Sequence, residues 1–204
     1  MNKKLNIILL DDHSLFLNGM KHLLSKSFEI NFRSFNSIKK LNKADLNFNN
    51  YDLFISDLEL PNEDIFSFFR IVRNNFSIPI LVISMHKKIS FIRRCQEIGI
   101  NGYILKNDDE YLISAVDNII EGKEYYSPMI KRVINDFSAN KKIISEREEQ
   151  VIKHICDGQS NLKISEFLSI TVETVKTHKK NIRIKLGVSN TAELIDYAKK
   201  NILF

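Results

Sequence analysis

Short apolar runs alternate with segments of helical periodicity along the first 125 residues. Residues 5–10 form a continuous apolar run typical of a buried strand, whereas residues 112–120 place apolar side chains near the 3.6-residue period of a helix. Strands are predicted at residues 5–10, 28–35, 53–56, 78–84 and 103–105, and helices near residues 15–24, 37–45, 66–72, 89–98 and 112–120. This alternation predicts an α/β fold over residues 1–125, a doubly wound parallel sheet of (βα)5 type.

The pattern changes after residues 126–142, which end in a polar stretch and are interpreted as a linker. No strand is predicted beyond them. Ser145 and Glu148 have the spacing of a capping box that opens a helix. Further helices are predicted at about residues 161–168, 171–186 and 191–200, with Gly158 and Gly187 ending the first and third helices. Residues 143–204 are therefore expected to form an all-α, four-helix domain that contains a helix-turn-helix.

Charge distinguishes the two parts of the chain. Residues 1–125 hold 16 Lys and Arg against 16 Asp and Glu, whereas residues 126–204 hold 14 against 9, so the net charge of +5 lies in the second part. A basic excess suits an anionic partner such as nucleic acid, although a solvated basic face is nearly as common. The two cysteines, Cys95 and Cys156, lack the spacing of a disulfide framework or a zinc site. With no apolar stretch long enough for a membrane span, a cytoplasmic protein is expected.

Acidic residues follow two of the predicted strands. Asp11 and Asp12 end the first strand and Asp57 ends the third, so a parallel sheet brings three carboxylates to one rim. Crowded carboxylates need a cation, and an oxygen-lined pocket suits Mg²⁺. Ser84 and Lys106 end the fourth and fifth strands. The set combines a carboxylate nucleophile, a metal cradle, a hydroxyl and an ammonium, which are the groups that phosphoryl transfer requires.

In order and spacing, these residues resemble the signature of receiver domains over about 120 residues. The resemblance implies that Asp57 is the phospho-acceptor, that Asp12 is a direct Mg²⁺ ligand and Asp11 a mainly water-mediated one, and that Glu59 contributes its backbone carbonyl. It also implies that Ser84 and Lys106 bind the phosphoryl oxygens and that Tyr103 forms a switch with Ser84. Ile65 stands where the family usually has Gly, Met85 where a small residue is common, and Asn107 where Pro is common.

A basic helix is predicted at residues 171–186. Val175 and Ile182 belong to its buried stripe, and the opposite face is rich in Lys and Thr, as expected of a helix that enters a DNA major groove. A solvated amphipathic helix is the simpler interpretation of this segment alone. Its context from Ser145 to Val188 resembles the NarL/FixJ/LuxR-type DNA-binding domain. The resemblance implies that Lys176, Thr177 and Lys180 face bases and that His178, Lys179 and Arg183 contact the backbone or flank these residues.

The two resemblances together imply a response regulator of the NarL/FixJ class rather than an enzyme. In that class a sensor histidine kinase phosphorylates the aspartate, and the protein then binds double-stranded promoter DNA, usually as a homodimer. The last helix, with Leu194, Ile195, Tyr197 and Ala198, is expected to pair the DNA-binding domains. Two alternatives remain open: a phosphorelay module that no longer binds DNA, and a regulator that binds DNA without phosphorylation.

Overall fold

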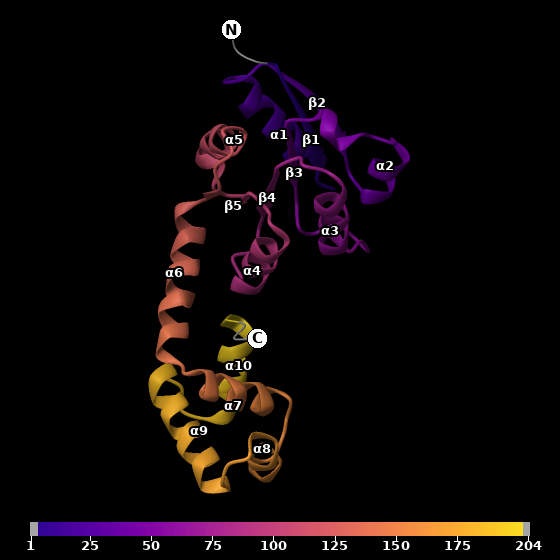
Figure 1. The fold of residues 1–204 in the computed structure, drawn as a ribbon. Helices are drawn as coiled ribbons and strands as arrows, with labels where there is room; N and C mark the ends of the chain where they lie inside the picture. The colour runs from indigo at the N-terminus through magenta and orange to yellow at the C-terminus, as the bar shows by residue number, and fades with distance from the viewer. Residues whose placement is uncertain (1–3, 202–204) are drawn as a thin grey trace. The chain divides into compact units, whose positions relative to one another are not determined.

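The computed structural model describes residues 4–201 and divides them into two compact units, with the boundary along the chain at Lys131 and Arg132 (Figure 1). Each unit has a hydrophobic core of its own. We refer to them as the N-terminal and C-terminal units. None of the helices within residues 4–201 is both long and apolar enough to cross a membrane.

The N-terminal unit contains a parallel sheet of six strands in the order β2-β1-β3-β4-β5-β6. The five predicted strands are confirmed, with small shifts at their ends. A sixth strand of two residues pairs with β5, and its length is too short to produce a recognisable periodicity. The strands are β1 (Leu5–Leu10), β2 (Ile30–Phe35), β3 (Leu53–Ser56), β4 (Ile80–Ser84), β5 (Gly102–Leu105) and β6 (Tyr125–Tyr126).

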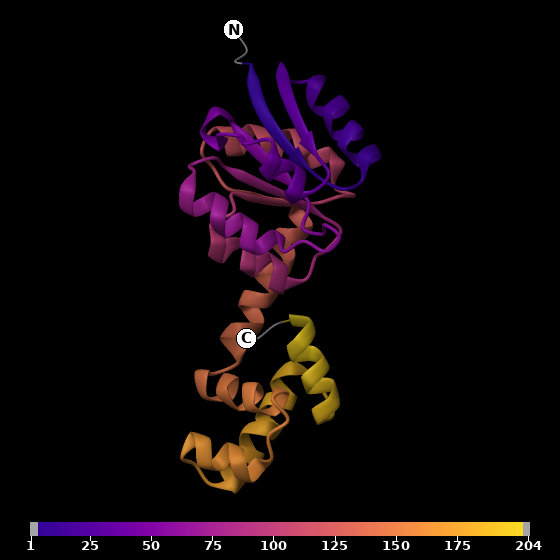
Figure 2. The same ribbon diagram turned by 90° about the vertical axis from the view of Figure 1, so that its right-hand side faces the viewer.

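Helices cover both faces of this sheet (Figure 2). On one face, apolar residues of α1 and α5 pack with those of the strands, including Met20, Leu81 and Val116. On the other, Phe54 of β3 makes edge contacts with Phe68 and Phe69 of α3. The helices of the unit are α1 (Ser14–Ser25), α2 (Ile38–Lys43), α3 (Ile65–Asn75), α4 (Ile89–Ile98) and α5 (Leu112–Ile120), with short 3-10 turns at Phe48–Asn50 and Asp109–Tyr111. Because both faces are covered, β3, β4 and β5 are buried along their whole length. The edge strand β2 instead alternates, with Asn31 and Arg33 exposed.

The segment interpreted as a linker is largely helical, because β6 is followed directly by α6 (Pro128–Ile143). Pro128 is the first residue of this helix, a position where its fixed φ angle is favourable and its missing N–H costs nothing. Ile130, Ile134 and Phe137 recur at helical spacing, and Ile130 is fully buried. Pro128 therefore starts α6, and the segment is not an extended linker.

Besides residues 132–143 of α6, the C-terminal unit contains the four predicted helices, α7 (Glu146–Cys156), α8 (Asn161–Leu168), α9 (Val172–Leu186) and α10 (Thr191–Asn201). The capping box of Ser145 and Glu148 is present, and the Thr171 hydroxyl accepts a hydrogen bond from the Thr174 N–H. Gly187 ends α9 with a positive φ of 67°, which suits glycine. Val151, Ile164, Val175 and Ile182 are at the centre of the core. These caps and contacts fix α8 and α9 as a helix-turn-helix.

Candidate functional site

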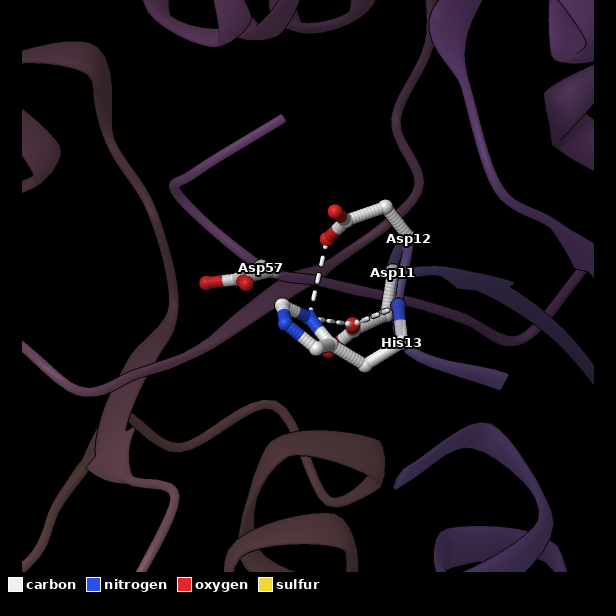
Figure 3. Close-up of side chains that lie close together, drawn as sticks. All are labelled: Asp11, Asp12, His13 and Asp57. Carbon is white, nitrogen blue, oxygen red and sulfur yellow. Dashed lines mark hydrogen bonds and ion pairs between the residues drawn. The ribbon is translucent and has the colours of Figure 1, made fainter. Parts of the chain in front are cut away.

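Three carboxylates meet at the carboxyl ends of β1 and β3, as the sequence predicts (Figure 3). Asp11 and Asp57 are only 1% and 4% exposed, and Asp12 lies beside them, half-buried. Potential ligand atoms of these residues and of His13 all lie within 4.8 Å of one another. Asp11 and Asp57 directly follow strands that are neighbours in the sheet, so the topology itself brings them together.

Lys106 joins the two buried carboxylates. Its Nζ lies 2.7 Å from Oδ2 of Asp11 and 2.7 Å from Oδ2 of Asp57, above the ring of Phe16. The other oxygen of Asp57, Oδ1, accepts a hydrogen bond of 2.6 Å from the N–H of Leu58. Both oxygens of Asp57 are therefore held in fixed positions by donors.

Burial and charge have opposite effects on the pKa values of Asp57 and Lys106. Burial raises the pKa of Asp57 above its ordinary value, against the hydrogen bond and charge of Lys106. Burial alone would lower the pKa of Lys106, but the hydrogen bonds and charges of Asp11 and Asp57 outweigh it, and the pKa is raised. One ammonium thus faces three clustered carboxylates, and the excess negative charge favours a further cation.

Ser84 and Tyr103, the predicted switch pair, are both fully buried on neighbouring strands. The hydroxyl of Ser84 accepts a hydrogen bond of 3.1 Å from the N–H of His86. The Tyr103 hydroxyl donates to the His86 carbonyl at 2.6 Å. Burial raises the pKa of Tyr103, although a hydrogen bond with Ser84 acts in the other direction. The structure therefore shows Tyr103 turned inward, with both residues bound to the loop that follows β4.

Two histidines that the sequence analysis left without a role lie at the site. The Nδ1 atom of His13 is 2.9 Å from Oδ1 of Asp12 and 3.1 Å from Oδ1 of Asp11. The Nε2 atom of His86 contacts Oε1 of Glu59, the residue for which only a backbone role was predicted. The position of His13 directly after two aspartates was a signal in the sequence, whereas nothing in the sequence pairs Glu59 with His86.

Two departures from the receiver signature have clear structural outcomes. Ile65 is buried as the first residue of α3, which Asp64 caps by accepting a hydrogen bond from the N–H of Ser67. Met85 is 66% exposed and, with Leu15 and His13, lines an open hollow beside the site. The larger side chains therefore extend into the core or toward solvent, and the acidic cluster is intact.

Helix α9 presents the basic face that the sequence predicts. Val175 and Ile182 are fully buried, whereas Lys176, Thr177 and Lys180 are exposed. Lys176 forms an exposed ion pair with Glu173, 3.0 Å long, that bulk solvent weakens. The three residues predicted to face bases are therefore accessible on one side of the helix.

Lys179 and Arg183 have contacts inside the C-terminal unit. The Nζ atom of Lys179 donates to Oδ1 of Asn161, the first residue of α8, at 3.0 Å. The Nε atom of Arg183 donates to the carbonyl of Lys179. Burial lowers the pKa of Lys179, and the charge of Arg183 lowers it further. Lys179 therefore holds α8 against α9.

The predicted pairing surface on α10 needs a correction. Leu194 and Ala198 are buried in the core of the C-terminal unit, and Ile195 and Tyr197 pack against that core as well. An apolar stripe on a terminal helix can face its own domain or a partner, and in this chain it faces its own domain. Leu194 and Ala198 are therefore not available to a second copy, whereas Ile195 and Tyr197 stay half-exposed, and their expected role in pairing remains a prediction.

Each of the two units matches a known protein family. The model of the response regulator receiver domain matches residues 7–117, and that of the bacterial regulatory proteins of the luxR family matches residues 142–198. The chain is 30% identical to the Fimbriae Z protein of Escherichia coli K12, with 97% of each chain covered. It is 29% identical to the oxygen regulatory protein NreC of Staphylococcus carnosus, with 98% of this chain and 99% of that protein covered.

Solved structures share the fold. The response regulator RcsB of Salmonella typhimurium has a TM-score of 0.68 at 24% identity, covering 98% of this chain and 99% of RcsB. A structure of RcsB bound to promoter DNA in the presence of the phosphomimetic BeF3⁻ has a TM-score of 0.63 at 24% identity, covering 98% of this chain and all of that chain.

Proposed function

Because the chain belongs to the two-component response regulators that join a receiver domain to a LuxR-type DNA-binding domain, we propose that phosphorylation of Asp57 controls promoter binding by α9. The family is one of DNA-binding transcription regulators and not of enzymes. The observation that carries the proposal is the position of Asp57: a nearly buried carboxylate, joined to Asp11 by Lys106, at the rim of the sheet.

The residues around Asp57 can each assist phosphoryl transfer from a histidine kinase. The carboxylate of Asp57 forms the new O–P bond as the N–P bond to the kinase histidine breaks. Lys106 is within reach of the incoming oxygens, and the Ser84 hydroxyl is a second donor. The oxygens of Asp11, Asp12 and Asp57, with the carbonyl of Glu59, would hold Mg²⁺, which neutralises the charge of the phosphoryl group.

The switch would use the loop after β4. A phosphoryl oxygen that accepts a hydrogen bond from Ser84 would draw this hydroxyl toward Asp57. In that loop, His86 donates its N–H to the Ser84 hydroxyl and accepts a hydrogen bond from the Tyr103 hydroxyl at its carbonyl, so a movement of Ser84 is passed on to Tyr103. The inward position of Tyr103 would then be stabilised, which is a local change that can bias a two-state element.

DNA is the proposed partner of the C-terminal unit. Lys176, Thr177 and Lys180 would reach base edges, and His178, Lys179 and Arg183 would contact phosphates or support the helix. The net charge of the chain favours this association. We also propose a homodimer as the active form and the cytoplasm as the location. The pairing surface would not include Leu194 and Ala198, which are buried.

Labelling with acetyl phosphate tests the acceptor. Full-length protein with Mg²⁺ should incorporate phosphate, and Asp57→Asn should not. Asp64→Asn is the matched control, because Asp64 is an exposed cap of α3 that retains an acceptor oxygen as Asn. Undiminished labelling of Asp57→Asn would refute the assignment of the acceptor. Equal affinity of the phosphorylated and unphosphorylated protein for one operator would refute control of DNA binding by Asp57.

A further inference from the structure

The ring of His13 lies against the carboxylates of the acidic cluster (Figure 3). Its Nδ1 atom is 2.9 Å from Oδ1 of Asp12 and 3.1 Å from Oδ1 of Asp11. The backbone N–H of His13 also donates to Oδ1 of Asp11, at 2.8 Å, which holds the start of α1 close to that carboxylate. A nitrogen that faces the oxygens of a cation site is in position to share the cation.

Lys106 and His13 use different oxygens of the cluster. Lys106 binds Oδ2 of Asp11 and Oδ2 of Asp57, whereas His13 faces Oδ1 of Asp11 and Oδ1 of Asp12. A metal ion on the His13 side could therefore bind without displacing the ammonium. The side chain of His13 is 66% exposed, so its ring can turn toward an ion without leaving a cavity in the core.

Imidazole nitrogen changes which ions such a site prefers. Mg²⁺ takes oxygen ligands and keeps several waters, whereas first-row transition ions bind imidazole well. The donor atoms of Asp11, Asp12, His13 and Asp57 lie within 4.8 Å of one another, so small side-chain rotations would place a nitrogen and carboxylate oxygens around one ion. Three oxygens and one nitrogen suit Ni²⁺ or Co²⁺ better than three oxygens alone, whereas Mn²⁺ gains less from the nitrogen.

We propose that His13 is a further ligand of the cation site and raises the preference of this site for first-row divalent transition ions, Ni²⁺ above all, over Mg²⁺. The proposal rests on the cation site of the proposed function. His13 binds the ion through the lone pair of Nδ1, and the proton of the neutral ring is then on Nε2. If the ring of His13 instead occupied the position of the cation, it would compete with every metal ion.

Calorimetric titration of the full-length protein with Mg²⁺, Mn²⁺ and Ni²⁺ separates these roles. Wild type, His13→Gln and the control His22→Gln are compared at about pH 8, above the ordinary pKa of imidazole. His22 is an exposed residue of α1, the helix that follows His13, and it is not part of the cluster. His13→Gln should weaken Ni²⁺ binding by at least about tenfold and Mn²⁺ binding by less, following the order of affinities of these ions for nitrogen ligands. Mg²⁺ affinity should be nearly unchanged.

The location of the ion is tested by NMR. Mn²⁺ should broaden the amide signals of Asp12, His13 and Asp57 in wild type, and higher concentrations should be needed in His13→Gln. Unchanged Ni²⁺ affinity in His13→Gln, an equal loss in His22→Gln, or tighter binding of all three ions by His13→Gln would each overturn the proposal. Failure of wild type to bind Mg²⁺ would instead refute the cation site of the proposed function, so the two failures are distinguishable.

Discussion

Lys185, near the end of α9, donates a hydrogen bond to Glu148 in the first turn of α7, with 2.7 Å between Nζ and Oε2. The same carboxylate oxygen accepts hydrogen bonds from the N–H and the hydroxyl of Ser145. Glu148 is 3% exposed, whereas Lys185 is partly open to solvent. One buried carboxylate therefore completes the cap of α7 and joins this helix to the end of α9.

Replacement of Glu148 by Gln should destabilise the C-terminal unit. Gln has nearly the same size but lacks the charge that binds Lys185, so we expect the free energy of unfolding to fall by about 1–3 kcal/mol. Urea unfolding, combined with amide exchange in α7 and α9, measures this loss of stability. Glu173→Gln is the control, because Glu173 pairs with Lys176 at the surface and should contribute less than about 1 kcal/mol. Equal losses in the two variants would contradict a special role of Glu148.

Acid should weaken the same contact. Burial alone would raise the pKa of Glu148, but the hydrogen bonds from Lys185 and Ser145 outweigh it and hold the pKa below its ordinary value. The unfolded chain therefore takes up the proton at a higher pH than the folded chain does. The contribution of Glu148 to stability is present above the ordinary carboxyl pKa and is lost as the pH falls through the lowered value in the folded state. The stability of wild type should fall more steeply than that of Glu148→Gln between about pH 5 and 3.

Replacement of Lys106 by Met should destabilise the N-terminal unit by about 3–5 kcal/mol, because two buried carboxylates lose their ammonium partner. Added Mg²⁺ should restore more stability to this variant than to wild type. Urea unfolding with and without Mg²⁺ gives both values. Lys123→Met removes an exposed ion pair with Glu121. It should change neither the stability nor the gain in stability from Mg²⁺ by more than about 1 kcal/mol. A Lys106→Met variant as stable as wild type would show that Asp11 and Asp57 need no cation.

Replacement of Tyr103 by Phe should loosen the loop after β4. The carbonyl of His86 loses the donor that the Tyr103 hydroxyl provides, at an expected cost of about 1–2 kcal/mol. Amide exchange at His86 should become faster, since its N–H is bound only to the hydroxyl of Ser84. Tyr51→Phe is a control outside the switch pair. Unchanged exchange at His86 would indicate that Tyr103 does not hold this loop.

Substitutions on α9 should separate sequence recognition from phosphate binding. Lys176→Ala should reduce the free energy of binding to the operator by about 1–3 kcal/mol and relax the sequence preference. Arg183→Ala should weaken binding to all DNA sequences alike. It should also reduce the dependence of the affinity on salt concentration by the equivalent of about one phosphate contact. Gel shifts at several salt concentrations, with Lys153→Ala on α7 as a control for charge, measure these effects. Wild-type binding by both variants would refute α9 as the recognition helix.

The position of the acidic cluster could be predicted from the sequence because it depends only on strand order. Parallel neighbouring strands end at one rim, so Asp11 and Asp57 must lie close whatever rotamers they adopt. The contacts of His13 and the pair of Glu59 with His86 depend instead on loop geometry and side-chain rotation. These have no signature in hydrophobic periodicity, and only coordinates reveal them.

Two other features of the sequence are compatible with more than one structure. Residues 126–142 were interpreted as a linker, but a proline such as Pro128 is also favourable at the first position of a helix. The apolar residues Leu194 and Ala198 fit a surface that pairs two copies as well as one that completes a core. Hydrophobic spacing identifies the face of a helix but not what covers it.

The short strand β6 has a consequence for the solubility of the receiver sheet. An edge strand with free backbone groups can recruit a strand of another molecule, which is a first step toward fibrous aggregation. Here the edge beyond β5 consists of Tyr125 and Tyr126, and Pro128 begins a helix two residues later without a backbone N–H to offer. On this side of the sheet, another chain finds almost no backbone on which to extend the ladder.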